Sequence, residues 1–527
     1  MALEAAYHYL QRAVGHGTST EALLLTVLLL LIIRLAWVRA FATTTASTKC
    51  KQQLPPTPPG KLPIIGHLHL IGSHPHVSFR DLAAKHGRDG LMLVHVGAVP
   101  TVVVSTPQAA EAVLRTHDHV FASRPRNPVA DIIRYNSTDI AFAPYGDYWR
   151  RARKVVNTHL LSVKMVYSKR HDREEEVRLV VAKIRELAMA APGKALDMTE
   201  LLGGYASDFV CRAVLGESHR KHGRNELFRE LTEISASLLG GFNLEDYFPR
   251  LANLDVFLRV VCSKAMGVSK RWDNLFNELI AEYEHGKEDN AEDFVHLLLS
   301  LKKEYGLSTD NVKAILNMFE AAIETSFLVL EYSMAELINN RHVMAKVQKE
   351  VRESTPHGEK LDLIMEEDLS RMPYLKATIK EAMRIHPPAP FLLPHFSTND
   401  CEINGYTIPA GTRVIVNAWA LARDPSHWER AEEFYPERFL QEGRDAEVDM
   451  YGKDIRFVPF GAGRRICAGA TFAIATVEVM LANLIYHFDW ELPSEMEAIG
   501  AKVDMSDQFG MTLRRTERLH LVPKIYK

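Results

Sequence analysis

The chain has 527 residues, 47% of them hydrophobic and 24% charged, so it is long enough for one large domain or several smaller ones. Its formal net charge of −3 gives no overall attraction to nucleic acid, which we exclude as a partner. The five cysteines are scattered, without a C-x-x-C pair. We therefore expect a reducing compartment, and neither a disulfide framework nor a structural zinc site.

An apolar segment near the N-terminus predicts a single-pass membrane anchor. Residues 22–41 are almost wholly apolar, and Arg34 stands where its side chain can reach the membrane surface. Basic residues follow this segment, while the residues before it carry more acidic than basic side chains. The positive-inside rule therefore puts residues 1–21 in the lumen and the bulk of the chain in the cytosol. A cleaved secretory signal is the alternative, but its charged leading region would be poor.

Residues 42–63 predict a basic, proline-rich linker. Its second half, LPPTPPGKLP at 54–63, has prolines that fix an extended backbone and cannot continue a helix. We expect a stiff spacer between the membrane and the folded domain. A ligand for an SH3-type module is the alternative.

Residues 64–527 predict one large domain that is mainly α with a small β part. The run LMLVHVGAVPTVVVS at 91–105 is rich in β-branched residues and predicts a hairpin at a sheet edge, and a second β region is expected between Cys401 and Val416. A loop is expected over 285–293. Apolar residues recur at helical spacing over 172–191, 226–239, 268–285, 293–305, 309–340 and 341–354.

The segment FVPFGAGRRICAG at 457–469 places a single thiol, Cys467, among glycines and arginines. A dinucleotide-binding loop would need a glycine where Ile466 stands, and a βαβ unit around it. A structural or activated cysteine is a second interpretation, because the arginines and a helix beginning after Gly469 would both lower the pKa of the thiol. A thiolate bound to a metal is the third.

The flanking residues favour a thiolate that binds haem iron. Phe460 can shield the sulfur, Gly463 and Gly469 let the backbone approach a flat macrocycle, and Arg465 can neutralise a propionate. The helix expected over 470–486 points its first N–H groups at the sulfur. Together with the cysteine, these residues spell F-x-x-G-x-R-x-C-x-G, which resembles the signature of the cytochrome P-450 haem-thiolate monooxygenases.

Two further matches support the resemblance. Glu381 and Arg384 stand one helical turn apart as E-x-x-R, and Arg438 follows within PERF. Taken alone, the first pair would be an ordinary surface salt bridge. The resemblance implies that the three residues form a structural lock behind the haem.

The sequence WRRAR resembles the W-x-x-x-R motif of the same family. Taken alone, it would be the basic face of a helix. The resemblance implies that Trp149 and Arg153 hold a haem propionate, and that His395 is a possible haem contact.

An acid and an alcohol, Glu324 and Thr325, stand inside the helix expected over 309–340. A capped surface turn is the ordinary explanation, but the flanking sequence is apolar over much of the helical circumference, which predicts burial. The resemblance implies that the pair relays protons to bound dioxygen. The chain departs from the family pattern at Ala322, where glycine is usual, and at Ala468, where proline is usual.

The resemblance also places a set of mostly apolar residues around the substrate. Their character favours a small, flat, mostly apolar substrate, although each could equally belong to the core. They are Ile132, Ile133, Met318, Ile323, Phe391, Leu392 and Phe509.

The resemblance implies the cytochrome P-450 fold and haem b bound through Cys467, whose thiolate donates electron density for cleaving dioxygen. Electrons would come from NADPH through a flavoprotein reductase in the endoplasmic reticulum membrane. Stretches such as MALEAAYHYLQ and FEAAIETSFLVLEYSMAELINN resemble the grass monooxygenases of benzoxazinoid biosynthesis.

The reaction that the resemblance favours most is N-hydroxylation of 2-hydroxy-1,4-benzoxazin-3-one, a small indole-derived bicyclic lactam. Oxidation of indolin-2-one or 3-hydroxyindolin-2-one in the same pathway is the alternative. A haem-thiolate isomerase or dehydratase, and a membrane-bound haem sensor without catalytic activity, are more distant possibilities.

Overall fold

The computed structural model describes residues 53–216, 220, 223–240, 244–248, 256–284, 293–354 and 361–526. Apart from Gln53, all of these residues belong to one compact unit, Leu54–Lys527. The predicted lumenal segment, the anchor at 22–41 and the first part of the linker lie outside the described residues.

The proline-rich segment at 54–63 packs against the domain. Pro55 and Pro58 are buried, and the carbonyl of Pro56 accepts a hydrogen bond from the N–H of Leu93 at 2.8 Å. The structure therefore places this half of the predicted spacer on the surface of the first sheet.

The largest sheet has the strand order β1-β2-β7-β4. Strands β1 (Leu91–Val96) and β2 (Val99–Val104) form the predicted hairpin at one edge, and Gly97 supplies the positive φ of its turn. Strand β7 (Arg413–Val416) runs parallel to β2, and β4 (His395–Phe396) is antiparallel to β7. The smaller sheets contain β5 (Cys401–Ile403) with β6 (Tyr406–Ile408), β9 (Asp507–Phe509) with β10 (Leu513–Arg515), and β3 (Leu196–Asp197) with β11 (His520–Ile525) and β8 (Phe488–Glu491).

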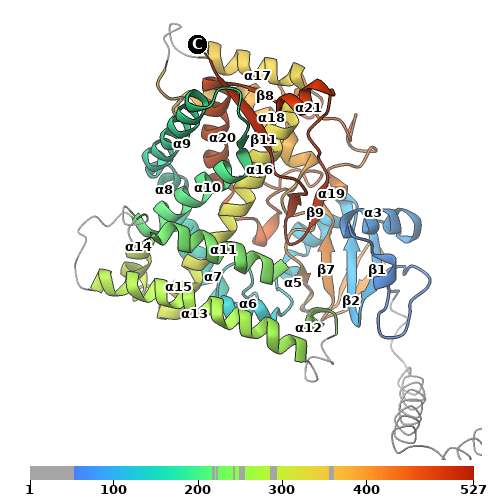
Figure 1. The fold of residues 1–527 in the computed structure, drawn as a ribbon. Coiled ribbons are helices and arrows are strands. Elements are labelled where there is room, and N and C mark those ends of the chain that lie inside the picture. Colours follow the sequence, from blue (N-terminus) through green and yellow to red (C-terminus); the bar gives the residue numbers. More distant parts are fainter. Residues whose placement is uncertain are drawn as a thin grey trace, which may run out of the picture. The chain divides into compact units, whose positions relative to one another are not determined.

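Most of the domain is helical, as the sequence predicts. Figure 1 shows the helices gathered on one side and β1, β2 and β7 on the other, with α3 beside them. The longer helices are α3 (Pro75–His86), α9 (Arg170–Ala190), α10 (Met198–Leu215), α11 (Arg224–Gly240), α13 (Val256–Glu284), α16 (Glu320–Asn339), α17 (Arg341–Glu353), α18 (Pro373–Ile385) and α20 (Ala470–His487). The shorter ones are α4 (Pro107–Glu111), α5 (Asp118–Phe121), α6 (Pro128–Ile133), α7 (Asp147–Val155), α8 (Val163–Ser168), α12 (Leu244–Tyr247), α14 (Phe294–Leu301), α15 (Thr309–Asn317), α19 (Ala418–Leu421) and α21 (Ser494–Ala498).

Two helices form the centre of the helical part. Residues 328–338 of α16 are all buried, and α16 packs against both α10 and α20. Helix α20 is long and apolar enough to cross a membrane, but 78% of it is buried inside the domain. It is therefore a core helix, and its side chains are apolar on most sides because most sides pack against the rest of the domain.

The helix predicted over 309–340 is interrupted at Met318 and Phe319. The N–H of Ala321 bonds to the carbonyl of Met318 at 3.1 Å, three residues back rather than four. The acceptor that a regular α-helix would offer, the carbonyl of Asn317, instead accepts from the guanidinium of Arg134 at 2.8 Å. The hydrogen bond from Arg134 thus takes the place of a helical one, so that α15 ends at Asn317 and α16 begins at Glu320.

Candidate active site around Cys467

Cys467 lies at the end of a tight loop that leads into α20. Its backbone N–H donates to the carbonyl of Phe460 at 2.8 Å, which closes the loop. The Cys467 side chain keeps accessible surface, yet burial raises the pKa of the thiol, while the N–H of Gly469 and the charge of Arg153 act in the opposite direction. The sulfur is thus crowded by protein atoms and still accessible to a ligand.

The structure accounts for Gly463 by packing. This residue has φ of +65°, and a Cβ added to it would come within 1.8 Å of the carbonyl oxygen of Leu114. Its missing side chain therefore lets the loop approach Leu114, where the sequence had suggested room for a macrocycle. At Gly469 an added Cβ would lie 3.8 Å from the sulfur of Cys467, which is an ordinary van der Waals contact.

Arg465 is held by backbone oxygens. Its guanidinium donates to the carbonyls of Ala122 at 2.5 Å, Ile140 at 3.1 Å and Ala143 at 2.5 Å, and it lies 4.3 Å from the ring centre of Trp149. Burial and the neighbouring arginines lower the pKa of Arg465 to about 8. The environment therefore lacks the negative charge that this guanidinium would favour.

Two more arginines add to this positive charge. Arg124, which sequence reasoning missed, donates to three backbone carbonyls, and Arg153 donates to the carbonyl of Ile466 at 2.6 Å. Within the described part of the chain, neither of them nor Arg465 forms an ion pair with a carboxylate. Burial lowers the pKa of Arg124 to about 10. A dianionic ligand would relieve this surplus charge.

The other predicted haem contacts already have hydrogen-bond partners. The indole N–H of Trp149 donates to the carbonyl of Ile140 at 2.9 Å. His395 is buried, with Nδ1 at 2.8 Å from the carbonyl oxygen of Phe121. Burial and the charge of Arg124 lower its pKa to about 3, so His395 is neutral near pH 7.

These residues fit a haem held through its iron and its propionates. The described residues contain no group of three or more His, Cys, Asp or Glu side chains that could hold a metal ion. A single thiolate therefore suits a metal whose other ligands belong to a macrocycle. Arg124, Arg153 and Arg465 suit the propionate groups of a haem. On α16, Ala321 is exposed and Thr325 is half-buried, so this part of the helix is accessible to a ligand.

Glu381, Arg384 and Arg438 form one buried cluster. Arg384 makes a two-pronged contact with Glu381, at 2.8 and 2.9 Å, and Arg438 reaches both carboxylate oxygens at 3.2 Å. The two arginines also donate to five backbone carbonyls between residues 422 and 433. The cluster ties α18 to the segment that precedes the Cys467 loop.

Glu324 and Thr325 are adjacent in α16, but their side chains have separate partners. The hydroxyl of Thr325 donates to the carbonyl of Ala321 at 2.8 Å. Glu324 accepts hydrogen bonds from Thr512 and from Arg514, the latter at 2.6 Å. The carboxylate is therefore tied to the C-terminal hairpin, and the two groups do not bond to each other directly.

The sequence profile of the Cytochrome P450 family matches residues 55–514. The chain belongs to the cytochrome P450 family. A zebra fish cytochrome P450 solved with abiraterone and a zebra fish cytochrome P450 solved with progesterone have TM-scores of 0.69 and 0.70 at 24% and 25% sequence identity. These comparisons cover 86% and 85% of this chain and 100% and 99% of those chains.

Several maize proteins resemble this cytochrome P450 along its whole length. The chain is 79% identical to a 3-hydroxyindolin-2-one monooxygenase, with 100% of this chain and 99% of that protein aligned. It is 62% identical to an indolin-2-one monooxygenase, with both chains fully covered, and 50% identical to an indole-2-monooxygenase over 99% of this chain and 98% of that one. The protein is thus a haem-dependent monooxygenase that receives its electrons from a reductase.

The structure brings together only part of the pocket that the sequence predicts for this cytochrome P450. Phe391 and Phe509 pack edge to face at 5.5 Å, and Leu392 follows with a positive φ of 55°. Ile132 and Met318 are half-buried. The structure places Ile133 and Ile323 in the hydrophobic core, where they pack with α7, α10 and α11.

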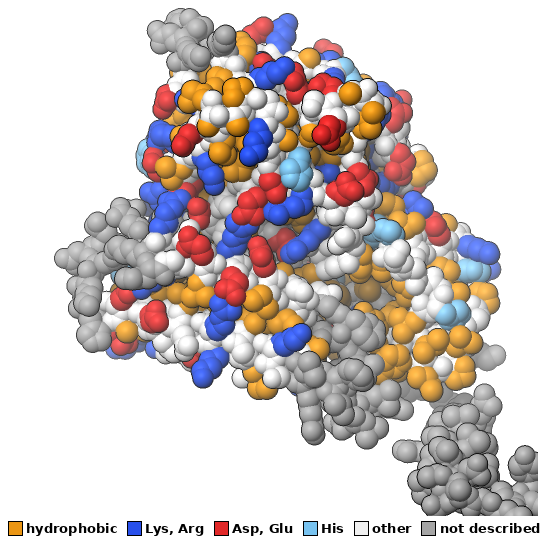
Figure 2. Space-filling model, in the orientation of Figure 1, with side chains coloured by type: hydrophobic (Ala, Val, Ile, Leu, Met, Phe, Trp, Pro, Cys, Tyr) orange, Lys and Arg blue, Asp and Glu red, His pale blue; other side chains and the backbone are white. Residues whose placement is uncertain are grey.

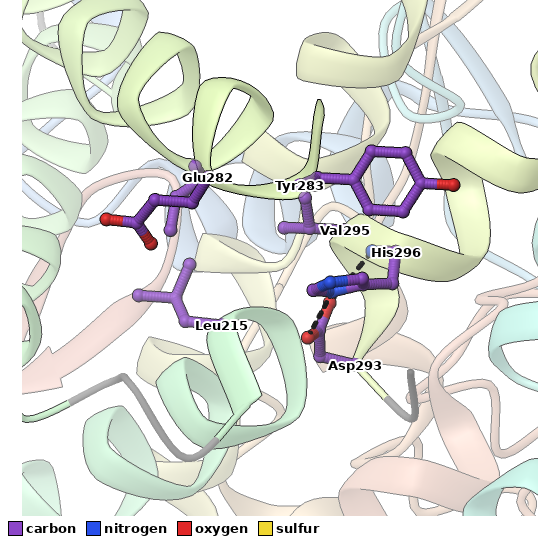
Figure 3. Close-up of a pocket in the computed structure, with 7 residues that line it drawn as sticks. Leu215, Glu282, Tyr283, Asp293, Val295 and His296 are labelled. Carbon is purple, nitrogen blue, oxygen red and sulfur yellow. Dashed lines mark hydrogen bonds and ion pairs between the residues drawn. The ribbon is translucent and has the colours of Figure 1, made fainter. Parts of the chain in front are cut away.

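A small cavity lies between α10, α13 and α14, and none of its lining residues is a predicted site residue (Figure 3). In it, Asp293 caps α14 through the N–H of His296 and also lies 2.6 Å from the Nδ1 atom of that residue. The cavity holds about 20 Å³, which is room for one water molecule. It is too small for an organic substrate.

Removing the carboxylate of Glu381 should destabilise the protein severely. In Glu381→Ala, two buried guanidinium groups lose the carboxylate that they share, and we expect the free energy of unfolding to fall by about 3–5 kcal/mol. Chemical denaturation followed by tryptophan fluorescence measures this change. Glu433→Ala, which removes an exposed carboxylate next to Arg430, is the control and should leave the denaturation midpoint almost unchanged. Equal midpoints for the two variants would contradict the prediction.

Gly463→Ala should impair haem incorporation more than Gly461→Ala. Both glycines have positive φ, but only at Gly463 would the new methyl group collide with a backbone oxygen, that of Leu114. The measurement is the fraction of each protein that shows the red-shifted absorption band of the reduced carbon monoxide complex. If both variants kept the same fraction, packing against Leu114 would not be what requires the glycine.

Proposed function

We propose that this cytochrome P450 inserts oxygen into a small bicyclic lactam derived from indole, with 3-hydroxyindolin-2-one as the first candidate substrate, in benzoxazinoid biosynthesis. The observation that carries the proposal is the similarity, along the whole chain, to the maize 3-hydroxyindolin-2-one monooxygenase. The comparisons therefore favour the alternative reaction over N-hydroxylation of 2-hydroxy-1,4-benzoxazin-3-one, which the sequence alone had put first. One atom of dioxygen enters the lactam and the other leaves as water, with two electrons from NADPH and two protons.

The proposal assigns the haem to the residues around Cys467. The sulfur of Cys467 would bind the iron, with the N–H of Gly469 supporting its negative charge. Arg465, Arg124 and Arg153 would hold the propionates, whose negative charge the buried guanidinium groups require. Haem bound through a thiolate supplies the redox chemistry that activates dioxygen.

The residues of α16 would handle protons. The hydroxyl of Thr325 lies next to the exposed Ala321 and can pass a proton through its Oγ1 atom. Glu324 is held by Thr512 and Arg514, and the Arg514 side chain is half exposed. The carboxylate of Glu324 thus lies between the buried part of α16 and the half-exposed side chain of Arg514. A group that passes protons from solvent to Thr325 needs such a position.

We also propose that residues 22–41 anchor the protein in the endoplasmic reticulum membrane, with residues 1–21 in the lumen, residues 42–63 as linker and the domain in the cytosol. The support is the apolar sequence followed by basic residues. Large apolar side chains are also exposed at the start of the domain, at Leu54, Leu62 and Ile64. Figure 2 shows hydrophobic side chains gathered on the part of the visible face that carries β1 and α3, while charges of both signs mix over the helices.

The substrate proposal is tested by turnover in microsomes. The full chain is expressed with a plant reductase and supplied with NADPH and, separately, indolin-2-one, 3-hydroxyindolin-2-one and 2-hydroxy-1,4-benzoxazin-3-one. We expect 3-hydroxyindolin-2-one to be oxygenated with the highest kcat/KM. Faster conversion of the benzoxazinone, or no NADPH-dependent oxygenation of any compound, would refute the assignment.

Thr325→Val should separate electron use from product formation. The variant keeps the shape of the side chain and loses its hydroxyl, so we expect substrate binding to persist while product formed per NADPH falls roughly tenfold or more. The ratio of product to NADPH consumed, with hydrogen peroxide measured in parallel, gives the result. Ser326→Val, at a buried neighbouring hydroxyl, is the matched control. A ratio that is unchanged in Thr325→Val would remove this residue from proton transfer.

A further inference from the structure

A buried polar cluster lies where α6, α15 and α16 meet. Arg134 follows the end of α6, Asn317 ends α15 and Glu320 begins α16. Their exposed fractions are 3%, 0% and 4%. The mostly apolar pocket that the sequence predicts contains none of these three side chains.

Arg134 holds the cluster together. Its guanidinium pairs with Oε1 of Glu320, lies 3.4 Å from Asp139, and donates to the backbone carbonyl of Asn317 at 2.8 Å. Two carboxylates thus face the charge of Arg134, and its guanidinium holds Glu320 in place.

Within the described residues, four side-chain atoms of the cluster are fully buried and have no hydrogen-bond partner. They are Oδ1 and Nδ2 of Asn317, Oε2 of Glu320 and Nε of Arg134, the last of which lies 3.4 Å from Asp139. Folded proteins pair nearly all such atoms, because an unpaired buried polar group costs free energy. Asn483 shows the usual arrangement: it is equally buried, and its carboxamide makes hydrogen bonds to the backbone of Ile364 and Val479. Asn317 therefore has donors and acceptors available for a ligand.

The position of Asn317 connects it to the open part of α16. Asn317 ends α15 four residues before Ala321, and Ala321 and Thr325 follow one another along one face of α16. Ala321 is exposed and Thr325 half-buried. The regular hydrogen bond from Ala321 to Asn317 is replaced by two others, from Ala321 to Met318 and from Arg134 to Asn317.

The chemistry of the unpaired atoms matches a cyclic lactam. A ring lactam holds its N–H and C=O on the same side, because the ring enforces the cis arrangement. A carboxamide presents an oxygen acceptor beside an N–H donor, so the two groups can form two parallel hydrogen bonds. A free carboxylate oxygen nearby accepts a hydrogen bond from a hydroxyl group.

We propose that Asn317 recognises the lactam group of the substrate and that Glu320 recognises a hydroxyl on the neighbouring ring carbon, with Arg134 as the positioning residue. This inference rests on the proposed function, since it takes a hydroxylated bicyclic lactam as the ligand. It assigns specificity to a polar end of the pocket. An apolar pocket alone separates compounds that differ in one polar group only weakly, whereas a site that pairs with that group rejects the analogue lacking it.

The experiment compares ligands that differ in one group. Indolin-2-one, 3-hydroxyindolin-2-one and the lactone benzofuran-2-one, in which oxygen replaces the lactam N–H, are titrated into the haem-loaded full-length protein. The Kd comes from the shift of the haem absorption band. We expect the native protein to bind the lactam roughly tenfold or more tightly than the lactone, and the hydroxylated lactam more tightly still.

The decisive variant is Asn317→Leu, which keeps the volume of the side chain and removes its hydrogen-bonding atoms. Since these atoms have no partner in the free protein, the thermal midpoint should stay level or rise, while the preference for lactam over lactone disappears. Asn483→Leu is the matched control: it removes a paired carboxamide, so it should lower the midpoint and keep the preference. Glu320→Gln should reduce the preference for the hydroxylated lactam.

Two results would overturn the inference. The first is equal binding of lactam and lactone by the native protein. The second is an Asn317→Leu variant whose midpoint falls as in Asn483→Leu while the ligand preference is unchanged. The microsomal assay distinguishes this inference from the proposed function. If lactam binding depends on Asn317 but no product forms, the proposed reaction is refuted and the recognition by Asn317 stands. If product forms but the protein shows no preference for lactam over lactone, only the recognition is refuted.

Discussion

Buried arginines determine how the distant parts of this cytochrome P450 are joined. A guanidinium taken out of water must find oxygen atoms, and in this chain those atoms belong to segments far away in the sequence. Arg384 and Arg438 share Glu381 and fasten α18 to the chain that leads to Cys467. Arg465 fastens the Cys467 loop to residues 122–143, and Arg134 fastens the end of α6 to the start of α16.

The features that the sequence predicted correctly are those whose causes are local. The hairpin of β1 and β2 follows from β-branched residues on both sides of Gly97, and the β region after Cys401 from a similar pattern. The mainly helical fold follows from apolar periodicity. The residues around Cys467 could be recognised because they are neighbours in the sequence as well as in space.

The features that the sequence did not predict depend on contacts between distant segments. The interruption of the helix at Met318 comes from Arg134, and nothing in the local sequence marks it. Arg124 joins the charges near Cys467 without any spacing that would reveal it. The need for glycine at 463 arises from the carbonyl of Leu114. Periodicity reports which face of an element is buried, but it does not report which partner a buried group meets.

The contact of Arg134 with two separate parts of the α15–α16 junction has a consequence for how this enzyme can change. One guanidinium neutralises Glu320, satisfies the carbonyl of Asn317 and leaves the carboxamide of that residue unpaired. A substitution of Arg134 or Glu320 removes one member of a buried ion pair, whereas the side chain of Asn317 can change without touching either the charge balance or the backbone bond. New substrate preferences are therefore expected to arise from single changes at position 317 but to require coordinated changes at positions 134 and 320.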